Sequence, residues 1–236
     1  MSQDDISRVV AQGYDQVADE YAALEAPDTP WPRLRRVQAF VAAMPPGSTV
    51  LDLGCGNGVP ATRAVAQSHS VVGIDISRGQ IERARANVPG AEFRVGDART
   101  IDFPDDSLDA VLALYLIDNV PASEYPALFA RFARWLKPGG RLLLSAEPGN
   151  DTGREYEWLG VPMFINTIPS SQLQAMLSEA SFDVVSAELE TQVEGGREIQ
   201  FLWIDAIAAS QTTASATVHT GATAEILPNP SAATGL

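Results

Sequence analysis

Short runs of apolar, often β-branched residues alternate with amphipathic stretches along the chain from about residue 50. The short runs predict strands near residues 49–53, 71–75, 92–95, 108–114, 140–146, 182–190 and 197–204. Apolar positions at helical spacing predict helices near residues 61–67, 77–87, 123–136 and 171–180. Strands and helices that alternate in this order are typical of an α/β fold with a mostly parallel sheet.

The chain outside this alternating pattern divides into three further segments. Helical spacing over residues 6–24 and 31–44 predicts a helical lead-in, which the prolines and glycine that follow would end. Residues 147–169 hold three glycines, three prolines and an aromatic cluster, so we expect an irregular insert. From residue 210 the chain is rich in Ala, Thr and Ser and loses its aromatic residues, which predicts a disordered tail. One domain is therefore expected over residues 1–209, followed by a tail over 210–236.

Composition narrows the choice of partners and location. The 236 residues include 30 acidic and 16 basic side chains, and the formal net charge of −14 disfavours nucleic acid and anionic membranes. The apolar runs are shorter than the roughly 20 residues that a membrane-spanning helix needs, and the N-terminus lacks the pattern of a secretory signal. A cytoplasmic protein is therefore expected. One cysteine and two distant histidines predict neither an internal disulfide nor a metal site.

The segment after the first predicted strand carries the clearest motif. The strand at residues 49–53 runs directly into Gly54-Cys55-Gly56-Asn57-Gly58. Glycines there let the backbone turn tightly and approach a ligand closely. Their spacing is G-x-G-x-G, whereas dinucleotide sites carry G-x-G-x-x-G, so a dinucleotide is not the expected ligand.

Two acidic residues strengthen this motif because each ends a neighbouring strand. Asp75 ends the second predicted strand, 21 residues after Gly54, and a carboxylate at that distance can accept both hydroxyls of a ribose. Asp97 follows the third strand and can meet the amino group of an adenine. Since the carboxyl ends of parallel strands meet at one edge of a sheet, the loop and the two acids together predict a nucleoside site.

These motifs resemble those of the class I S-adenosylmethionine-dependent methyltransferases. The resemblance spans most of residues 4–207 and rests on segments 50–60, 73–77, 93–98, 109–119 and 136–144. It implies a Rossmann-like, seven-stranded, mostly parallel sheet with helices on both faces, an antiparallel last strand and a helical N-terminal lid. It also implies S-adenosyl-L-methionine as the cofactor and methyl transfer as the reaction.

The resemblance also implies roles for particular residues. Gly54 and Gly56 would lie under the methionine part of the cofactor, and Asp52 would help to hold its amino group. Asp75 would bind the ribose, and the adenine would lie against the residues that follow the second and third strands. The full set of expected cofactor-binding residues is Tyr14, Tyr21, Asp52, Gly54, Cys55, Gly56, Asp75, Ile76, Asp97, Ala98, Leu114 and Tyr115. Tyr14 and Tyr21 are seven residues apart and so share one helical face. The resemblance implies that they belong to the lid; the alternative is that they are core or interface aromatics.

The insert at residues 147–169 is the expected acceptor pocket. Apolar walls with few polar groups suit a small ligand, although the same side chains would also serve to cap the end of the sheet. The candidate substrate-binding residues are Tyr156, Trp158, Met163 and Phe164.

Candidates for proton transfer are few. In similar enzymes a histidine often stands where this chain has Asn119, and another where it has Asn166-Thr167, so two candidate bases are missing. Catalytic residues are therefore unassigned, and the remaining candidates for accepting or orienting a proton are Tyr115, Asp118 and Glu147. Each of them is also explained as a solvated or structural polar group.

Several functions remain open from the sequence. The leading one is methylation of O, N, S or C of a small molecule by an SN2 displacement that depends on positioning, in a monomer or homodimer. A protein or RNA methyltransferase is one alternative, although the net charge disfavours RNA. A protein that binds the cofactor and steers a non-methylating reaction is another.

Overall fold

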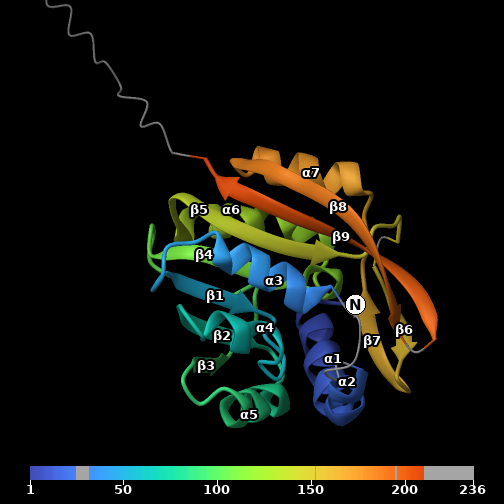
Figure 1. Ribbon diagram of the computed structural model, residues 1–236. Coiled ribbons are helices and arrows are strands. Elements are labelled where there is room, and N and C mark those ends of the chain that lie inside the picture. Colours follow the sequence, from blue (N-terminus) through green and yellow to red (C-terminus); the bar gives the residue numbers. More distant parts are fainter. Residues whose placement is uncertain (25–31, 152, 195, 210–236) are drawn as a thin grey trace, which may run out of the picture.

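Seven strands form one mixed sheet in the computed structural model, which describes residues 1–24, 32–151, 153–194 and 196–209 (Figure 1). Neighbouring strands follow the order β3-β2-β1-β4-β5-β9-β8. Their bounds are β1 Thr49–Leu53, β2 Ser70–Asp75, β3 Glu92–Val95, β4 Leu108–Leu114, β5 Leu136–Ala146, β8 Phe182–Glu194 and β9 Arg197–Ala208. The tail expected at residues 210–236 lies outside the described residues.

The direction of the strands agrees with the sequence-based expectation. β1 to β5 pair in parallel, whereas β9 runs antiparallel to both β5 and β8. This confirms the seven-stranded, mostly parallel sheet with an antiparallel last strand. β8 and β9 are longer than predicted because they form a hairpin whose pairing continues from Phe182 and Ala208 to Glu194 and Arg197.

Helices cover both faces of the sheet, as predicted. Leu51 and Leu53 of β1 point to one face, where they join a core with α6 (Tyr125–Trp135) and α7 (Ser170–Glu179). Val50 points to the other face, which α3 (Arg33–Ala42) and α4 (Ala61–Val65) cover. This alternation follows from the two-residue period of a strand, and it explains why β1 is apolar on both sides.

The large side chains of α6 anchor the first of these cores. They recur three and four residues apart and are at most 1% exposed: Tyr125, Leu128, Phe129, Phe132 and Trp135. Burying a side chain of this size stabilises the fold by roughly 1.5–3 kcal/mol. The strands that lead to the site are therefore supported by a well-packed core.

The strand order places a crevice at one edge of the sheet. From β1 the chain builds outward to β2 and β3 on one side, and to β4 and β5 on the other. Open α/β sheets bind ligands outside the carboxyl ends of the strands where the order reverses in this way. The glycine loop, which follows β1, lies at that point.

The first two helices of the lead-in lie beside this edge (Figure 1). The helix predicted over residues 6–24 is divided at Val17 into α1 (Gln3–Gln16) and α2 (Ala18–Leu24), and α1 begins with a capping box between Ser2 and Asp5. The Asp15 carboxylate accepts hydrogen bonds from Ser77 Oγ at 2.5 Å and from Gly79 N at 2.9 Å. These bonds join α1 to the start of α5 (Arg78–Asn87).

The segment expected to be irregular contains a hairpin, so that prediction is wrong for residues 154–165. β6 (Arg154–Trp158) pairs antiparallel with β7 (Val161–Ile165). Leu159 and Gly160 between them have φ of +49° and +79°. Positive φ at both central residues is typical of a tight two-residue hairpin turn. Gly160 adopts this conformation without strain because it has no Cβ. Alternation in β6 turns Tyr156 and Trp158 to the same side.

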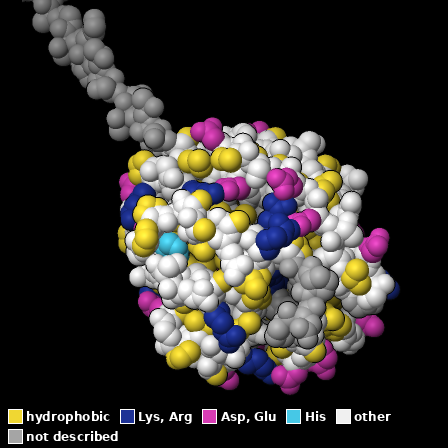
Figure 2. Space-filling view, viewed as in Figure 1, with side chains coloured by type: hydrophobic (Ala, Val, Ile, Leu, Met, Phe, Trp, Pro, Cys, Tyr) yellow, Lys and Arg dark blue, Asp and Glu magenta, His cyan; other side chains and the backbone are white. Residues whose placement is uncertain are grey.

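Charged side chains are scattered over the face of the molecule seen in Figure 2. In Figure 2 the Lys and Arg side chains form separate small groups, several of them beside acidic side chains. Among the described helices, none is long and apolar enough to cross a membrane. Within the same residues, His, Cys, Asp and Glu side chains form no group of three or more that could hold a metal ion.

Candidate functional site

The loop after β1 has a backbone that glycine alone adopts easily. Gly54, Gly56 and Gly58 have φ of +76°, +53° and +79°. Gly54 N donates to Ile74 O at 2.7 Å, which ties the loop to the end of β2. A Cβ on Gly54 would lie 3.0 Å from Leu116 Cδ1, whereas a Cβ on Gly56 would meet no atom within 4 Å. Gly56 therefore borders open space.

Asp75, at the end of β2, supports this loop through its carboxylate. Oδ2 accepts from Gly56 N at 2.9 Å, and Oδ1 accepts from Ser77 N at 2.8 Å. Burial raises the pKa of Asp75 to about 6, although the two backbone hydrogen bonds act in the opposite direction. The carboxylate is therefore fixed in orientation and retains lone pairs for a hydroxyl-bearing ligand.

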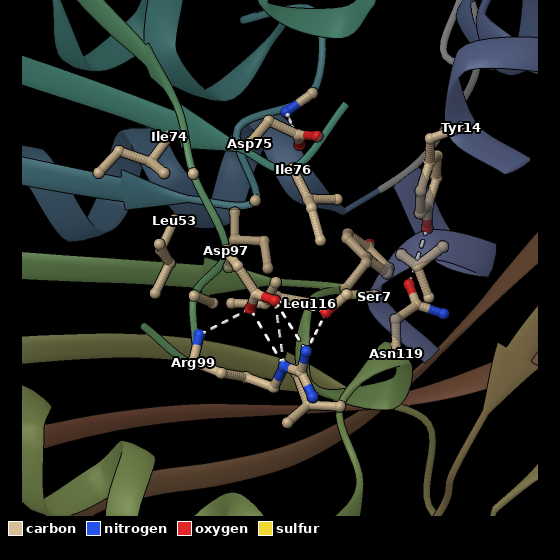
Figure 3. Close-up of a pocket in the computed structure, with 18 of the residues that line it drawn as sticks. Ser7, Tyr14, Leu53, Ile74, Asp75, Ile76, Asp97, Arg99, Leu116 and Asn119 are labelled. Atoms are coloured by element: carbon tan, nitrogen blue, oxygen red, sulfur yellow. Dashed lines mark hydrogen bonds and ion pairs between the residues drawn. The ribbon is translucent and has the colours of Figure 1, made fainter. Parts of the chain in front are cut away.

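Asp97 follows β3 and is held by groups from two elements (Figure 3). It accepts hydrogen bonds from Arg99 N at 2.8 Å, from Arg99 Nη2 at 2.9 Å and from Ser7 Oγ of α1 at 2.5 Å. Burial alone would raise the pKa of Asp97, but the hydrogen bonds from Arg99 and Ser7 outweigh it and lower the pKa. Asp97 is thus a charged group that fastens α1 to the sheet edge.

A pocket, called here the first pocket, lies between α1 and the carboxyl ends of β1 to β4. Its empty volume is about 770 Å³, part of it open to solvent, which is within the range of ligand sites. All of the expected cofactor-binding residues except Asp52 and Cys55 line it: Tyr14, Tyr21, Gly54, Gly56, Asp75, Ile76, Asp97, Ala98, Leu114 and Tyr115.

Asp52 and Cys55 have side chains that face away from the first pocket. The Asp52 carboxylate is buried behind the loop and accepts from Thr62 Oγ1 at 2.5 Å, and burial raises its pKa to about 6. The Cys55 thiol packs among the apolar side chains between α5 and β3, and burial raises its pKa well above its ordinary value. Both residues shape the loop from behind.

Arg33 also lines the first pocket, although no sequence pattern indicated this. Its guanidinium lies 4.2 Å from the centroid of the Tyr115 ring, and Nη2 donates to Tyr21 Oη at 3.0 Å. The charge of Arg33 lowers the pKa of Asp52. A buried cation therefore lies near the glycine-loop end of the pocket. Sequence cannot separate it from Arg35 and Arg36, which form ion pairs with acidic residues of β8.

Other lining residues were also missed because they come from α1 or from the turns after β3 and β4. These residues are Ile6, Ser7, Val10, Arg99, Leu116, Asn119 and Val120. The helical spacing of α1 predicted a buried face but not what that face covers.

A second pocket adjoins the first. Its empty volume is about 1570 Å³ including open solvent, and its lining comes from α1, α2, the β6–β7 hairpin, the β8–β9 hairpin and the turns after β4 and β5. The residues that line both pockets are Tyr14, Tyr21, Tyr115 and Asn119. The two pockets therefore meet at one boundary.

The predicted substrate-binding residues divide between two places. Tyr156 and Trp158 line the second pocket. Met163 and Phe164 do not: they are buried beneath α1, where a Cβ on Gly13 would fall 2.2 Å from Met163 Sδ and where Phe164 packs on Ile6. Both side chains therefore pack against α1, and their burial is structural.

Three rings form an aromatic wall at the boundary between the pockets. The centroids of Tyr14, Tyr21 and Trp158 lie 5.4–5.8 Å apart in edge-to-face contacts. Tyr14 Oη donates to Asn119 Oδ1 at 2.9 Å, and Asn119 Nδ2 donates to Phe164 O at 2.7 Å. Both polar atoms of the Asn119 amide are thus engaged.

All three candidate catalytic residues line the second pocket. Tyr115 has φ of +55°, and its hydroxyl donates to Gln192 Oε1 at 2.8 Å. Both carboxylate oxygens of Asp118 accept from Glu147 N, at 3.2 and 3.1 Å. Burial raises the pKa of Asp118 well above its ordinary value and raises that of Glu147 in the same direction.

Comparison with known proteins connects this geometry to a protein family. Residues 50–140, from β1 into β5, match the model of a methyltransferase domain. The chain is 34% identical over 183 residues to a 27-O-demethylrifamycin SV methyltransferase from Amycolatopsis mediterranei, which covers 72% of this chain and 65% of that protein. The chain spans less than two thirds of the length of the curated relatives that it matches first.

Solved structures show the same fold at lower identity. A SAM-dependent methyltransferase from Methanosarcina mazei superposes with a TM-score of 0.65 at 21% identity, covering 73% of this chain and 98% of that one. The [4+2]-cyclase SpnF superposes with a TM-score of 0.64 at 18% identity, covering 85% and 95%. The fold is therefore shared by proteins with different reactions.

Proposed function

The chain belongs to the class I S-adenosylmethionine-dependent methyltransferases, and we propose that it transfers the methyl group of this cofactor to a small molecule. The cofactor would occupy the first pocket and the acceptor the second. The observation that supports this arrangement most strongly is their common boundary, since four residues line both pockets. A methyl group held there is within reach of either side.

The polar groups of the first pocket match those of the cofactor. The Asp75 carboxylate would accept the two ribose hydroxyls, and Ile76 and Ala98 would pack against the adenine. The buried guanidinium of Arg33 would pair with the carboxylate of the methionine part. Gly56 would let that part approach the backbone, because a side chain there would enter the same space.

Positioning is the main contribution of the protein to this reaction. The bound cofactor supplies a methyl group already activated by a sulfonium. The aromatic wall of Tyr14, Tyr21 and Trp158 would hold an acceptor atom in line with that group and keep water away from it. Alignment at 3–3.5 Å can lower a barrier by about 7–11 kcal/mol, which is large compared with the effect of a single base.

Proton transfer would fall to the carboxylates of the second pocket. The Tyr115 hydroxyl already donates to Gln192, so Tyr115 serves as a wall. The Glu147 carboxylate lines the pocket, and its backbone N–H orients Asp118. Burial raises the pKa of Glu147 toward neutrality, which suits a group that accepts a proton from the acceptor.

Binding without methyl transfer is the second candidate function. It is favoured by the amide at position 119, where similar enzymes often carry a histidine, and by the engagement of both polar atoms of that amide. In that case the charge of the bound sulfonium would steer another reaction in the second pocket.

One experiment separates the two candidates. The protein is incubated with S-adenosylmethionine and small-molecule extracts, and the products are analysed by mass spectrometry. Methyl transfer predicts release of S-adenosylhomocysteine and an acceptor whose mass rises by about 14 Da. Cofactor binding in calorimetry with no S-adenosylhomocysteine across the extracts would favour the second candidate. Absence of cofactor binding would contradict both.

A further inference from the structure

We propose that the second pocket selects an acceptor that carries an amine, which is a cation in neutral solution. This inference rests on the function proposed above and adds the chemical class of the acceptor. It comes from the distribution of charge over the pocket walls, from the aromatic surfaces beside it and from the chemistry of transferring a methyl group to nitrogen.

The inner part of the second pocket is acidic. Asp118 is buried, and Glu147 and Glu194 are half-buried. They come from three separate places in the fold, the turn after β4, the turn after β5 and the end of β8. The charges of Glu147 and Glu194 raise the pKa of Asp118 beyond the larger effect of its burial, and the charge of Glu147 also raises the pKa of Glu194. The three acidic groups therefore share one region, in which the negative charge of Glu147 and Glu194 favours the neutral form of Asp118.

The positive groups of the lining lie at the rim. Arg154 and Arg197 are exposed, as are the acidic rim residues Glu157 and Glu198. Arg154 Nε donates to Asp151 Oδ2 at 2.5 Å, which offsets part of its charge, although that charge still lowers the pKa of Glu147. The rim carries charges of both signs. Among the described residues, the charged side chains that line the pocket inside the rim are acidic, so an anionic acceptor would be repelled there.

Arg33 is a buried cation whose charge acts on this region. Its charge lowers the pKa of Glu194, so the two groups interact across the boundary. Arg33 lines the first pocket, however, and lies over the Tyr115 ring. It is assigned there to the carboxylate of the cofactor, which would offset its charge. The loaded enzyme would then present a net negative region to the acceptor.

Aromatic side chains complete the walls around this region. Tyr14, Tyr21 and Trp158 stand at the boundary, and Tyr156 lies on the hairpin beside them. Ring faces attract ammonium groups, by roughly 0.5–2 kcal/mol for each favourable contact. The field of the three carboxylates reaches Tyr156, since it raises the pKa of that phenol beyond the effect of burial. Carboxylates and rings thus favour the same kind of ligand.

The same groups suit the reaction at nitrogen. The bound ammonium first gives one proton to a carboxylate of the inner group, which frees the nitrogen lone pair. That pair forms the new N–C bond while the electrons of the C–S bond go to sulfur, so the positive charge moves from sulfur to nitrogen. The remaining carboxylates stabilise this charge where it develops. A phenolate or carboxylate, the form in which such an acceptor attacks, carries a negative charge in the same place and would be repelled.

Matched probes test this inference with the full chain loaded with cofactor. Phenethylamine, 2-phenylethanol and phenylacetate share one ring and chain length and differ in charge. Calorimetry at low salt is expected to rank the amine about tenfold or more above the alcohol, with the acid weakest. High salt should reduce the preference for the amine. Equal affinities, a preference for the alcohol or acid, or absence of amine binding would overturn the proposal.

Two variants locate the effect. Glu194→Gln and Glu147→Gln keep the shape of the pocket and are each expected to weaken the amine about five- to tenfold while leaving the alcohol unchanged. Glu179→Gln, on the exposed end of α7, should change neither. Unchanged amine binding in both pocket variants would count against the inference. Cofactor affinity is measured first, because its loss alone would contradict the proposed function instead.

Discussion

Tyr14 Oη donates a 2.9 Å hydrogen bond to Asn119 Oδ1, across 105 positions of the chain. The bond joins α1 to the turn after β4. Asn119 Nδ2 also donates to Phe164 O, which joins the same turn to β7. Three elements that meet only in the folded molecule are therefore linked at the boundary between the two pockets.

Tyr14→Phe is expected to loosen α1 and weaken cofactor binding several-fold. The variant leaves Asn119 Oδ1 without its donor, and an unsatisfied polar group of this kind costs about 1–3 kcal/mol. Calorimetry gives the affinity, and hydrogen exchange should be faster in α1 than in β1. Tyr156→Phe is the control, because it removes a phenol from the second pocket without touching this bond. Wild-type affinity in Tyr14→Phe would show that the bond does not hold the lid.

Gly56→Ala is expected to reduce cofactor affinity by more than about tenfold while the protein stays folded. The methyl group would enter open space at the wall of the first pocket, where the methionine part would lie. Gly47→Ala is a matched control, since Gly47 also has a positive φ of +79° and free space around its Cβ. Both variants should lose about 1–2 kcal/mol of stability from backbone strain. Only the first should lose affinity, and an equal loss in both would contradict this reading of the loop.

Cofactor affinity is expected to fall as the pH drops through about 6. Burial raises the pKa of Asp75 to about 6, so the carboxylate is ionised above that pH and protonated below it. The ionised form is the better acceptor for two ribose hydroxyls, and affinity should therefore be constant above pH 7 and decrease below 6. In Asp75→Asn the affinity should be low and nearly independent of pH over this range. A wild-type affinity that is flat from pH 5 to 8 would exclude this role.

Gly13→Ala is expected to displace α1 from β7. Its Cβ would fall 2.2 Å from Met163 Sδ and 3.2 Å from Pro162 O, so either the buried Met163 side chain or the helix must move. Overpacking of this kind typically costs about 1–3 kcal/mol, measured here as a lower thermal midpoint together with weaker cofactor binding. The double variant with Met163→Ala removes the closer contact and should recover part of both. If Gly13→Ala behaves like the wild type, the helix does not depend on this contact.

The sequence by itself determined the sheet and the position of the first pocket. Periods of two and 3.6 residues give strands and helices wherever one face must be buried, and this local rule gave seven strands in the right places. The spacing of Gly54, Asp75 and Asp97 was equally informative, because parallel strands bring their carboxyl ends to one edge whatever the details of packing. These are local signals with a fixed geometric consequence.

Only the tertiary structure decided which side chains face the pockets. Asp52 and Cys55 belong to the motif, yet their side chains turn behind the loop, since burial at a tight turn depends on neighbours such as Thr62. Met163 and Phe164 looked like a pocket wall and instead support α1. The hairpin at residues 154–165 was missed because its turn requires a positive φ at Leu159, which local preference does not predict.

The electrostatics of Arg33 and the three inner carboxylates likewise could not be predicted from the sequence. Net charge is a property of composition, but its local sign depends on which segments fold together, and Asp118, Glu147 and Glu194 come from three distant parts of the chain. Burial raises the pKa of all three, and neighbouring carboxylates raise the pKa of Asp118 and Glu194 further. Neither cause exists in the unfolded chain. The sequence therefore determined the first pocket, and the fold determined the lining and charge of the second.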